Sequence, residues 1–169
     1  MKILLATTAF KLNGGGIASY NNELYDIFKH EHIIHLLTTD TVEVGKSIEK
    51  VYRILPKTTW IYKSYEKLVC QINSEQYDLI INSDSSFVAI VAPYLNAPIV
   101  TISHSYNNLP TLRASYNHQY NSKIIALSNA GREFMIDFFR IKNEDKVEMI
   151  YNFVKDDLCY EIKDKPKRD

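Results

Sequence analysis

The sequence predicts an α/β protein with a mainly parallel sheet of about seven strands and with helices on both faces. Two observations lead to this prediction. Apolar runs of strand length recur along the chain; three of the seven are continuously apolar and the others hold a single polar residue, as in strands buried on both faces of a parallel sheet. Segments with helical spacing of apolar residues lie between these runs. The alternation indicates a Rossmann-like, doubly wound fold.

The predicted strands are short and apolar, and they lie at residues 3–6, 33–37, 51–55, 79–81, 99–102, 124–127 and 147–150. The predicted helices carry apolar residues three or four positions apart, and they lie within 17–28, 61–72 and 134–139. The polar stretch 40–50 is expected to be a loop. We assign residues 1–154 to one domain and residues 155–169, which are rich in charge, to a linker or tail.

The composition fits one soluble globular domain. The chain has 169 residues, of which 46% are hydrophobic and 24% charged. Twenty acidic and twenty basic side chains cancel, so no overall field favours nucleic acid or an anionic bilayer. The two cysteines, Cys70 and Cys159, suggest neither a disulfide framework nor a zinc site. With an N-terminal apolar run too short for a signal peptide, a cytoplasmic setting is expected.

Small and polar residues follow nearly every predicted strand. In an open parallel sheet, ligands bind beyond the carboxyl ends of the strands, so these residues are the candidates for a site. They lie at 13–16, 82–86, 103–105, 128–129 and 151–152. We expect them to converge on one edge of the sheet.

The glycine run 14–16 precedes the first predicted helix. Because Gly14, Gly15 and Gly16 have no side chains, the backbone amides at the helix N-terminus can approach an anion or a sugar closely. A plain strand-to-helix turn is the simpler interpretation. A dinucleotide-binding fingerprint is a rival, with Asp40 as the acid that would meet the ribose, but Ser19 stands where its third glycine belongs.

His104 comes directly after the strand at 99–102 and Ser103, where an imidazole could donate to a sugar hydroxyl or to a phosphate oxygen. The alternative is a histidine that only caps a loop. Asp84 follows the preceding strand, and it is a candidate to orient His104 or to act as a base. A role as a turn residue is an equal candidate for Asp84.

Two further patterns have simpler explanations. The three histidines His30, His32 and His35 span a helix end and a strand start, so no metal site is expected there. Basic residues alternate with aromatic ones on the second predicted helix, and contact with an anionic membrane surface or a lipid-linked acceptor is one interpretation of this pattern. A solvated basic face is the favoured interpretation. The basic residues of this pattern are Lys57, Lys63 and Lys67, and the aromatic ones are Trp60, Tyr62 and Tyr65.

Three passages, taken in order, resemble a known family. Residues 14–24 are similar to its glycine-rich loop and first helix, residues 77–82 and 98–104 to its two central strands with a strand-end histidine, and residues 124–131 with 146–154 to its last strand-helix-strand passage. The family is the N-terminal domain of the family-4, GT-B-fold glycosyltransferases, the retaining group that uses nucleotide-sugars. The resemblance runs from the first strand to about residue 154.

This resemblance implies roles for several residues. Gly15 and Gly16 would lie near the donor diphosphate and the acceptor, His104 would contact the transferred sugar, Ser128 would line the cleft, and Asn152 would precede the crossover to a second domain. Two residues depart from the family: Ser19 replaces a frequent arginine, and Phe153 replaces the usual glycine.

The expected function is therefore that of the N-terminal half of a glycosyltransferase that transfers a sugar to a polysaccharide or glycolipid acceptor. We expect the chain to be inactive alone, because the C-terminal donor-binding domain is its partner. No metal or other cofactor is expected beyond the nucleotide-sugar substrate. Two alternatives stay open: a stand-alone nucleotide-binding Rossmann module, and a non-catalytic subunit that pairs with a separate donor domain.

Overall fold

A computed structural model of the chain describes residues 1–11, 15–39, 48–54, 62–104 and 117–152, with only the backbone for residues 62–64. The described strands are β1 (Lys2–Thr7), β2 (Ile33–Thr38), β3 (Val51–Arg53), β4 (Leu79–Ser83), β5 (Ile99–Ser103), β6 (Asn121–Ala126) and β7 (Val147–Met149). The described α-helices are α1 (Gly16–Phe28), α2 (Tyr62–Ser74), α3 (Ser86–Val91) and α5 (Asn129–Phe139). Short 3-10 turns occupy Ala92–Tyr94, His118–Tyr120 and Glu144–Lys146.

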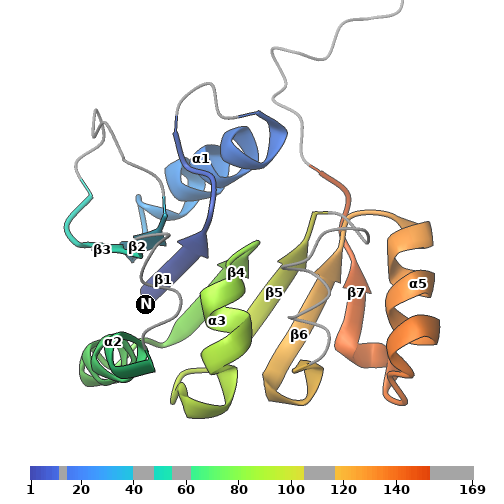
Figure 1. Ribbon diagram of the computed structural model, residues 1–169. Helices are drawn as coiled ribbons and strands as arrows, with labels where there is room; N and C mark the ends of the chain where they lie inside the picture. The colour runs from blue at the N-terminus through green and yellow to red at the C-terminus, as the bar shows by residue number, and fades with distance from the viewer. Residues whose placement is uncertain (12–14, 40–47, 55–61, 105–116, 153–169) are drawn as a thin grey trace, which may run out of the picture.

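The strands form one sheet in the order β3-β2-β1-β4-β5-β6-β7, and every ladder between neighbours is parallel (Figure 1). All carboxyl ends therefore meet at one edge. The order reverses between β1 and β4, because β1 pairs with β2 on one side and with β4 on the other. In open α/β sheets this reversal marks the position of ligand sites.

Helices cover both faces of the sheet, as the alternation of side chains along β1 shows. Leu5 belongs to the cluster under α1, together with Leu24. Its neighbour Leu4 belongs to the cluster under α2 and α3, together with Ile72 and Val88. Each parallel crossover buries an apolar stripe of its helix on the sheet, and this burial is the main source of stability of the fold.

Helix α5 packs on the face opposite α1. Met135 of α5 is buried against Ile124 and Ala126 of β6, whereas Ile125 between them packs with the α1 cluster. Right-handed crossovers produce this arrangement, because the chain moves in one direction from β1 to β2 and in the other from β4 onward. The sequence prediction of a doubly wound α/β fold is confirmed.

Some predicted bounds differ from the observed ones. β4 extends through Ser83, β6 begins at Asn121, and β3 ends at Arg53. The helix α3 was not predicted at all. Its six residues are mostly branched or aromatic and buried, so the sequence carries no polar face that would reveal a helical period.

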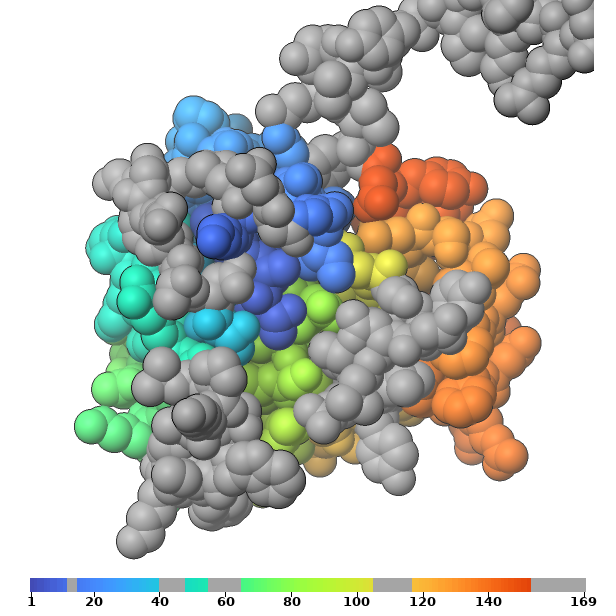
Figure 2. Space-filling view, turned by 45° about the horizontal axis from the view of Figure 1, so that its top comes forward, coloured from blue at the N-terminus to red at the C-terminus, as the bar shows by residue number. Residues whose placement is uncertain are grey.

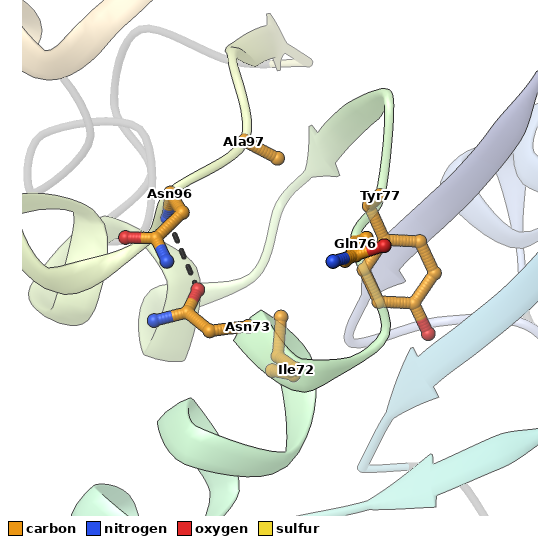
Figure 3. A pocket seen from close by; sticks show the side chains of 6 residues that line it. All are labelled: Ile72, Asn73, Gln76, Tyr77, Asn96 and Ala97. Carbon is orange, nitrogen blue, oxygen red and sulfur yellow. Dashed lines mark hydrogen bonds between the residues drawn. The ribbon is translucent and has the colours of Figure 1, made fainter.

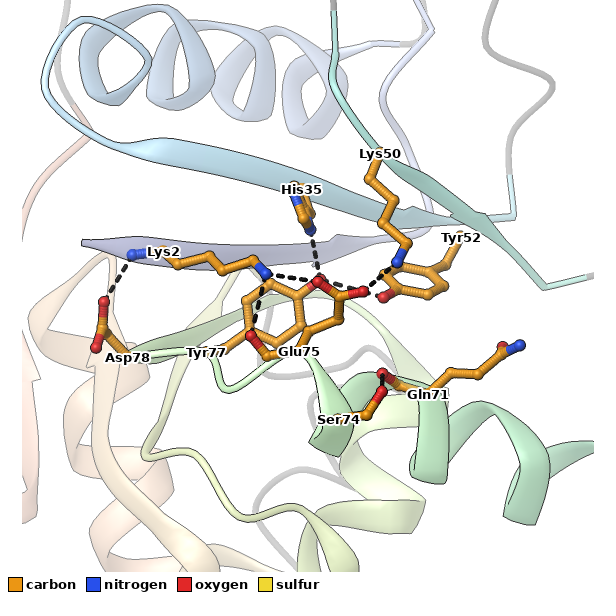
Figure 4. Close-up of polar contacts among 9 residues, drawn as sticks. All are labelled: Lys2, His35, Lys50, Tyr52, Gln71, Ser74, Glu75, Tyr77 and Asp78. Atoms are coloured by element: carbon orange, nitrogen blue, oxygen red, sulfur yellow. Dashed lines mark hydrogen bonds and ion pairs between the residues drawn. The ribbon is translucent and has the colours of Figure 1, made fainter.

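The amino edge of the sheet is fixed by ion pairs (Figure 4). Glu75, at the end of α2, pairs with both Lys2 and Lys50. The backbone N–H of Lys2 also donates to Asp78 Oδ2 at 2.7 Å. Hydrogen bonds from Lys2 and then from Lys50 lower the pKa of Glu75 to about 2. These contacts join the start of β1 to the segments that precede β3 and β4.

None of the described helices has the length and apolar character to cross a bilayer.

Candidate functional site

The first helix begins with two glycines at the carboxyl edge of the sheet. Gly15 has φ 87° and ψ −171°, a conformation that side chains rarely adopt, and Gly16 is the first residue of α1. A Cβ on either glycine would meet nothing within 4 Å. The requirement for glycine at position 15 is therefore conformational, and the space above both residues is open to a ligand. Gly14 lies outside the described residues.

Two asparagines of α1 hold the chain that leads from β1 to these glycines. Asn21 Nδ2 donates to Thr7 Oγ1 at 2.7 Å and to the carbonyl of Ala9 at 3.0 Å. Asn22 Nδ2 donates to the carbonyl of Phe10 at 2.9 Å. Both asparagines are buried. Because buried amide groups need partners, these bonds fix the loop after β1 relative to the helix.

Asp84 lies at the end of β4 in a left-handed backbone conformation, with φ 72°. It forms an isolated antiparallel bridge with Thr7, and Thr8 Oγ1 lies 3.4 Å from its Oδ2 atom. Asn82 Oδ1 accepts a hydrogen bond from the backbone N–H of Ser85 at 2.9 Å, which stabilises the turn. A non-glycine residue at positive φ carries local strain, and such strain is found often at functional sites.

His104 follows β5 and contacts residues from two other elements. Its Nε2 atom lies 2.7 Å from Oγ of Ser83, the last residue of β4. Its ring packs against the ring of Tyr20 on α1, with a centroid distance of 4.9 Å and an interplanar angle of 80°. Burial lowers the pKa of His104 to about 4, so the imidazole is neutral at pH 7.

These contacts bring three predicted segments together at the carboxyl edge: the glycine turn with α1, the end of β4, and the end of β5. Figure 2, with this edge turned toward the viewer, shows the yellow end of β5 beside the blue atoms of the N-terminal elements. The sequence makes Asp84 a candidate to orient His104 or to act as a base, with a role as a turn residue as an equal alternative. The residue bonded to His104 is Ser83 instead, because the backbone at Asp84 turns toward β1.

The other two predicted site residues follow β6 and β7. Ser128 is the N-cap of α5, and its Oγ accepts a hydrogen bond from the backbone N–H of Gly131 at 3.1 Å. This bond gives Ser128 a structural role as a helix cap. Asn152 is exposed beyond the end of β7. Their predicted contacts with ligand stay predictions.

Several other sequence hypotheses fall partly outside the described residues. Asp40, Lys57 and Trp60 lie outside them, as does the side chain of Lys63. Lys67 is exposed on α2, so membrane contact through this segment stays a prediction. Within the described part of the chain, no group of three His, Cys, Asp or Glu side chains could hold a metal ion.

One histidine of the predicted cluster has a structural explanation. His35 is buried in β2, and its Nδ1 atom lies 2.7 Å from the hydroxyl of Tyr77, which is also buried (Figure 4). Burial lowers the pKa of His35. The histidine thus joins β2 to the segment before β4 at the amino half of the sheet.

A pocket of about 300 Å³ lies at the amino edge, away from the candidate site (Figure 3). Its lining comes from the end of α2 and from the segments that precede β4 and β5. The Asn73 side chain links the end of α2 to the segment before β5. Its Oδ1 accepts a hydrogen bond from the backbone N–H of Asn96 at 3.0 Å, and its Nδ2 donates to the carbonyl of Tyr94 at 2.8 Å. These bonds explain Asn73 as a structural clamp. The residues that the sequence predicts to bind a ligand lie at the opposite edge of the sheet.

Comparison with solved structures shows which proteins share the fold. A glycosyltransferase from Rickettsia africae ESF-5 has the same fold, with a TM-score of 0.65 and 19% identity over 89% of this chain and 42% of that chain. The lipopolysaccharide outer core galactosyltransferase WaaB has a TM-score of 0.65 and 16% identity over 98% of this chain and 50% of that chain. The UDP-GlcNAc 2-epimerase of Methanocaldococcus jannaschii also shares the fold, with a TM-score of 0.62 and 14% identity over 90% of this chain and 46% of that chain. The fold is thus that of a GT-B domain, and the chain spans half the length or less of these proteins.

The sequence itself assigns the family. Residues 15–158 match the model of Glycosyltransferase Family 4, and this match covers most of the chain. The chain therefore belongs to Glycosyltransferase Family 4. Comparison with curated proteins gives no match. The family assignment rests on this match, because an epimerase shares the fold.

Proposed function

We propose that this chain is the acceptor-side half of a retaining glycosyltransferase that moves a sugar from a nucleotide-sugar to a polysaccharide or glycolipid acceptor. One observation carries the proposal: the family's glycine turn and strand-end histidine lie on adjoining elements at the carboxyl edge of the sheet, joined through the contact of Tyr20 with His104. The start of α1, with glycines and no acidic residue in its first turn, suits the diphosphate of a nucleotide-sugar.

The chain alone is proposed to be inactive. Stabilisation of the leaving diphosphate dominates the chemistry of such a transfer, and it requires charged donors around the phosphates. The candidate site residues named above offer glycine amides and a neutral imidazole, and none of these residues has a cationic side chain. The structures with the same fold are about twice as long, so we place the remaining donors on a second domain.

A titration of the isotopically labelled 169-residue chain with UDP-glucose, GDP-mannose and UDP tests the proposal. We expect weak binding, with changes in the NMR signals of Gly15, Gly16 and His104. Gly16→Ala is the matched variant, because a Cβ there meets nothing within 4 Å and the residue is helical, so the fold stays intact while the approach of a phosphate is hindered. Signal changes that centre on Asn73 and Asn96 at the opposite pocket would contradict the assignment.

Activity is tested separately. The purified chain is incubated with the same nucleotide-sugars and with a glycolipid acceptor fraction, and release of nucleotide is measured. We expect no release above background from the chain alone. Turnover by the chain alone would refute the proposed need for a second domain. A dehydrogenase-like module, the main alternative, would instead bind a reduced nicotinamide cofactor and enhance its fluorescence.

A further inference from the structure

A buried hydroxyl contacts the histidine of the candidate site. The side chain of Ser83 is 0% exposed, and its Oγ atom lies 2.7 Å from His104 Nε2. Within the described part of the chain, this nitrogen is the only hydrogen-bond partner of the Ser83 hydroxyl. Because no water reaches Ser83, its hydroxyl hydrogen has to be used inside the protein.

Two arrangements of protons are compatible with the distance of 2.7 Å. If Nε2 carries the imidazole proton, it donates to Ser83 Oγ, and the hydroxyl hydrogen of the serine is left without an acceptor. If Nδ1 carries the proton, the Ser83 hydroxyl donates to Nε2, and both groups are satisfied. Leaving a buried donor without an acceptor is costly, so the second arrangement is favoured.

We propose that Ser83 is a positioning residue that holds His104 in the tautomer protonated at Nδ1, so that the imidazole presents an N–H donor to an oxygen of the ligand. Tyr20 fixes the plane of the same ring from α1.

The charge of the ring supports this role. Burial lowers the pKa of His104 to about 4, so at pH 7 the ring is neutral and has one donor and one acceptor nitrogen. With the acceptor nitrogen occupied by Ser83, the ring has no free lone pair with which to act as a base. The Nδ1–H group suits an uncharged hydrogen-bond acceptor, such as a hydroxyl oxygen of a sugar. This choice of ligand rests on the proposed function, whereas the tautomer does not.

Long-range ¹H–¹⁵N spectra of the chain labelled with ¹⁵N-histidine decide the tautomer at pH 7. The His104 signals are identified by their loss in His104→Gln. We expect a protonated, pyrrole-type Nδ1 and an unprotonated, pyridine-type Nε2. A proton on Nε2 would overturn the proposal. Because no ligand or turnover is involved, this result is independent of whether the chain binds a nucleotide-sugar.

Two serine variants test whether Ser83 sets the tautomer. Ser83→Ala is expected to lose the predominance of the Nδ1–H form and to raise the titration midpoint of His104, since the hydroxyl stabilises the neutral ring. Ser103→Ala is the matched control: Ser103 is also buried and adjoins His104, and no hydrogen bond joins its side chain to the imidazole in the described structure. An unchanged spectrum in Ser83→Ala would refute the positioning role. If that variant does not fold, the wild-type spectrum still decides the tautomer.

Discussion

Replacement of His104 by glutamine should flatten the dependence of the free energy of unfolding on pH. In the folded chain, burial lowers the pKa of His104 to about 4, whereas an exposed histidine titrates near 6.5. Between these values the unfolded chain binds a proton that the folded chain does not. The folded state therefore loses stability as the pH falls from about 6.5 to about 4, and this contribution levels off below pH 4.

The size of the effect follows from the same pKa values. The difference between the pKa of about 4 in the folded chain and that of about 6.5 in the unfolded chain corresponds to about 3 kcal/mol at pH 4. His104 keeps some contact with solvent, so we expect about 2–3 kcal/mol. Urea denaturation followed by circular dichroism at several pH values between about 7 and 4 measures it. Other titrating groups, including His35, are common to both proteins, so the difference between wild type and His104→Gln isolates this residue.

Equal pH dependence in the two proteins would refute the reasoning, because it would mean that His104 is protonated as readily in the folded chain as in the unfolded one. Glu75→Gln provides a contrast in a different pH range. The pKa of Glu75 is lowered to about 2, so its contribution is present above pH 4.5 and is lost as the pH falls toward 2. The glutamine variant should therefore be less stable than wild type above pH 4.5, and this difference should shrink as the pH falls toward 2.

Three further substitutions are expected to change stability. Gly15→Ala should destabilise by about 1–3 kcal/mol because of its φ of 87°, whereas Gly16→Ala should be close to neutral; equal urea midpoints of the two would contradict the conformational argument. Arg140→Gly should stabilise by about 0.5–1 kcal/mol, since Arg140 ends α5 with φ 52° and ψ 45°, and a lower melting temperature would count against it. Ser128→Ala should cost about 1 kcal/mol through loss of the cap on Gly131 N–H, which thermal unfolding can measure.

Much of the fold could be predicted from the sequence, because the strands of a parallel sheet are buried on both faces. The run at 3–6 is continuously apolar, the run at 99–102 is apolar except for Thr101, and both form central strands. The start of β6 is different: Asn121, Ser122 and Lys123 are polar, and their strand conformation comes from pairing with β5. Helix α3 was missed because its burial under α2 and against the sheet, not its own propensity, determines its conformation.

The candidate site was predicted only in part. A glycine run and a strand-end histidine are visible in the sequence, since position along a strand determines the edge at which they lie. The contact of Ser83 with His104 is different, because it depends on the register of β4 against β5, in which Ser83 pairs with Ile102. The positive φ of Asp84 likewise results from its bridge with Thr7, a contact between residues far apart in the chain.

The position of β1 has a consequence for how the chain folds during synthesis. Its two neighbours, β2 and β4, are made at different times, and β3 and α2 emerge from the ribosome between them. Until residues 79–83 arrive, the ladder side of β1 that will pair with β4 is an open edge with apolar side chains such as Ile3 and Leu5. Such edges favour aggregation and incorrect pairing. Nascent chains that stop before β4 should thus depend on chaperones more than chains that include it.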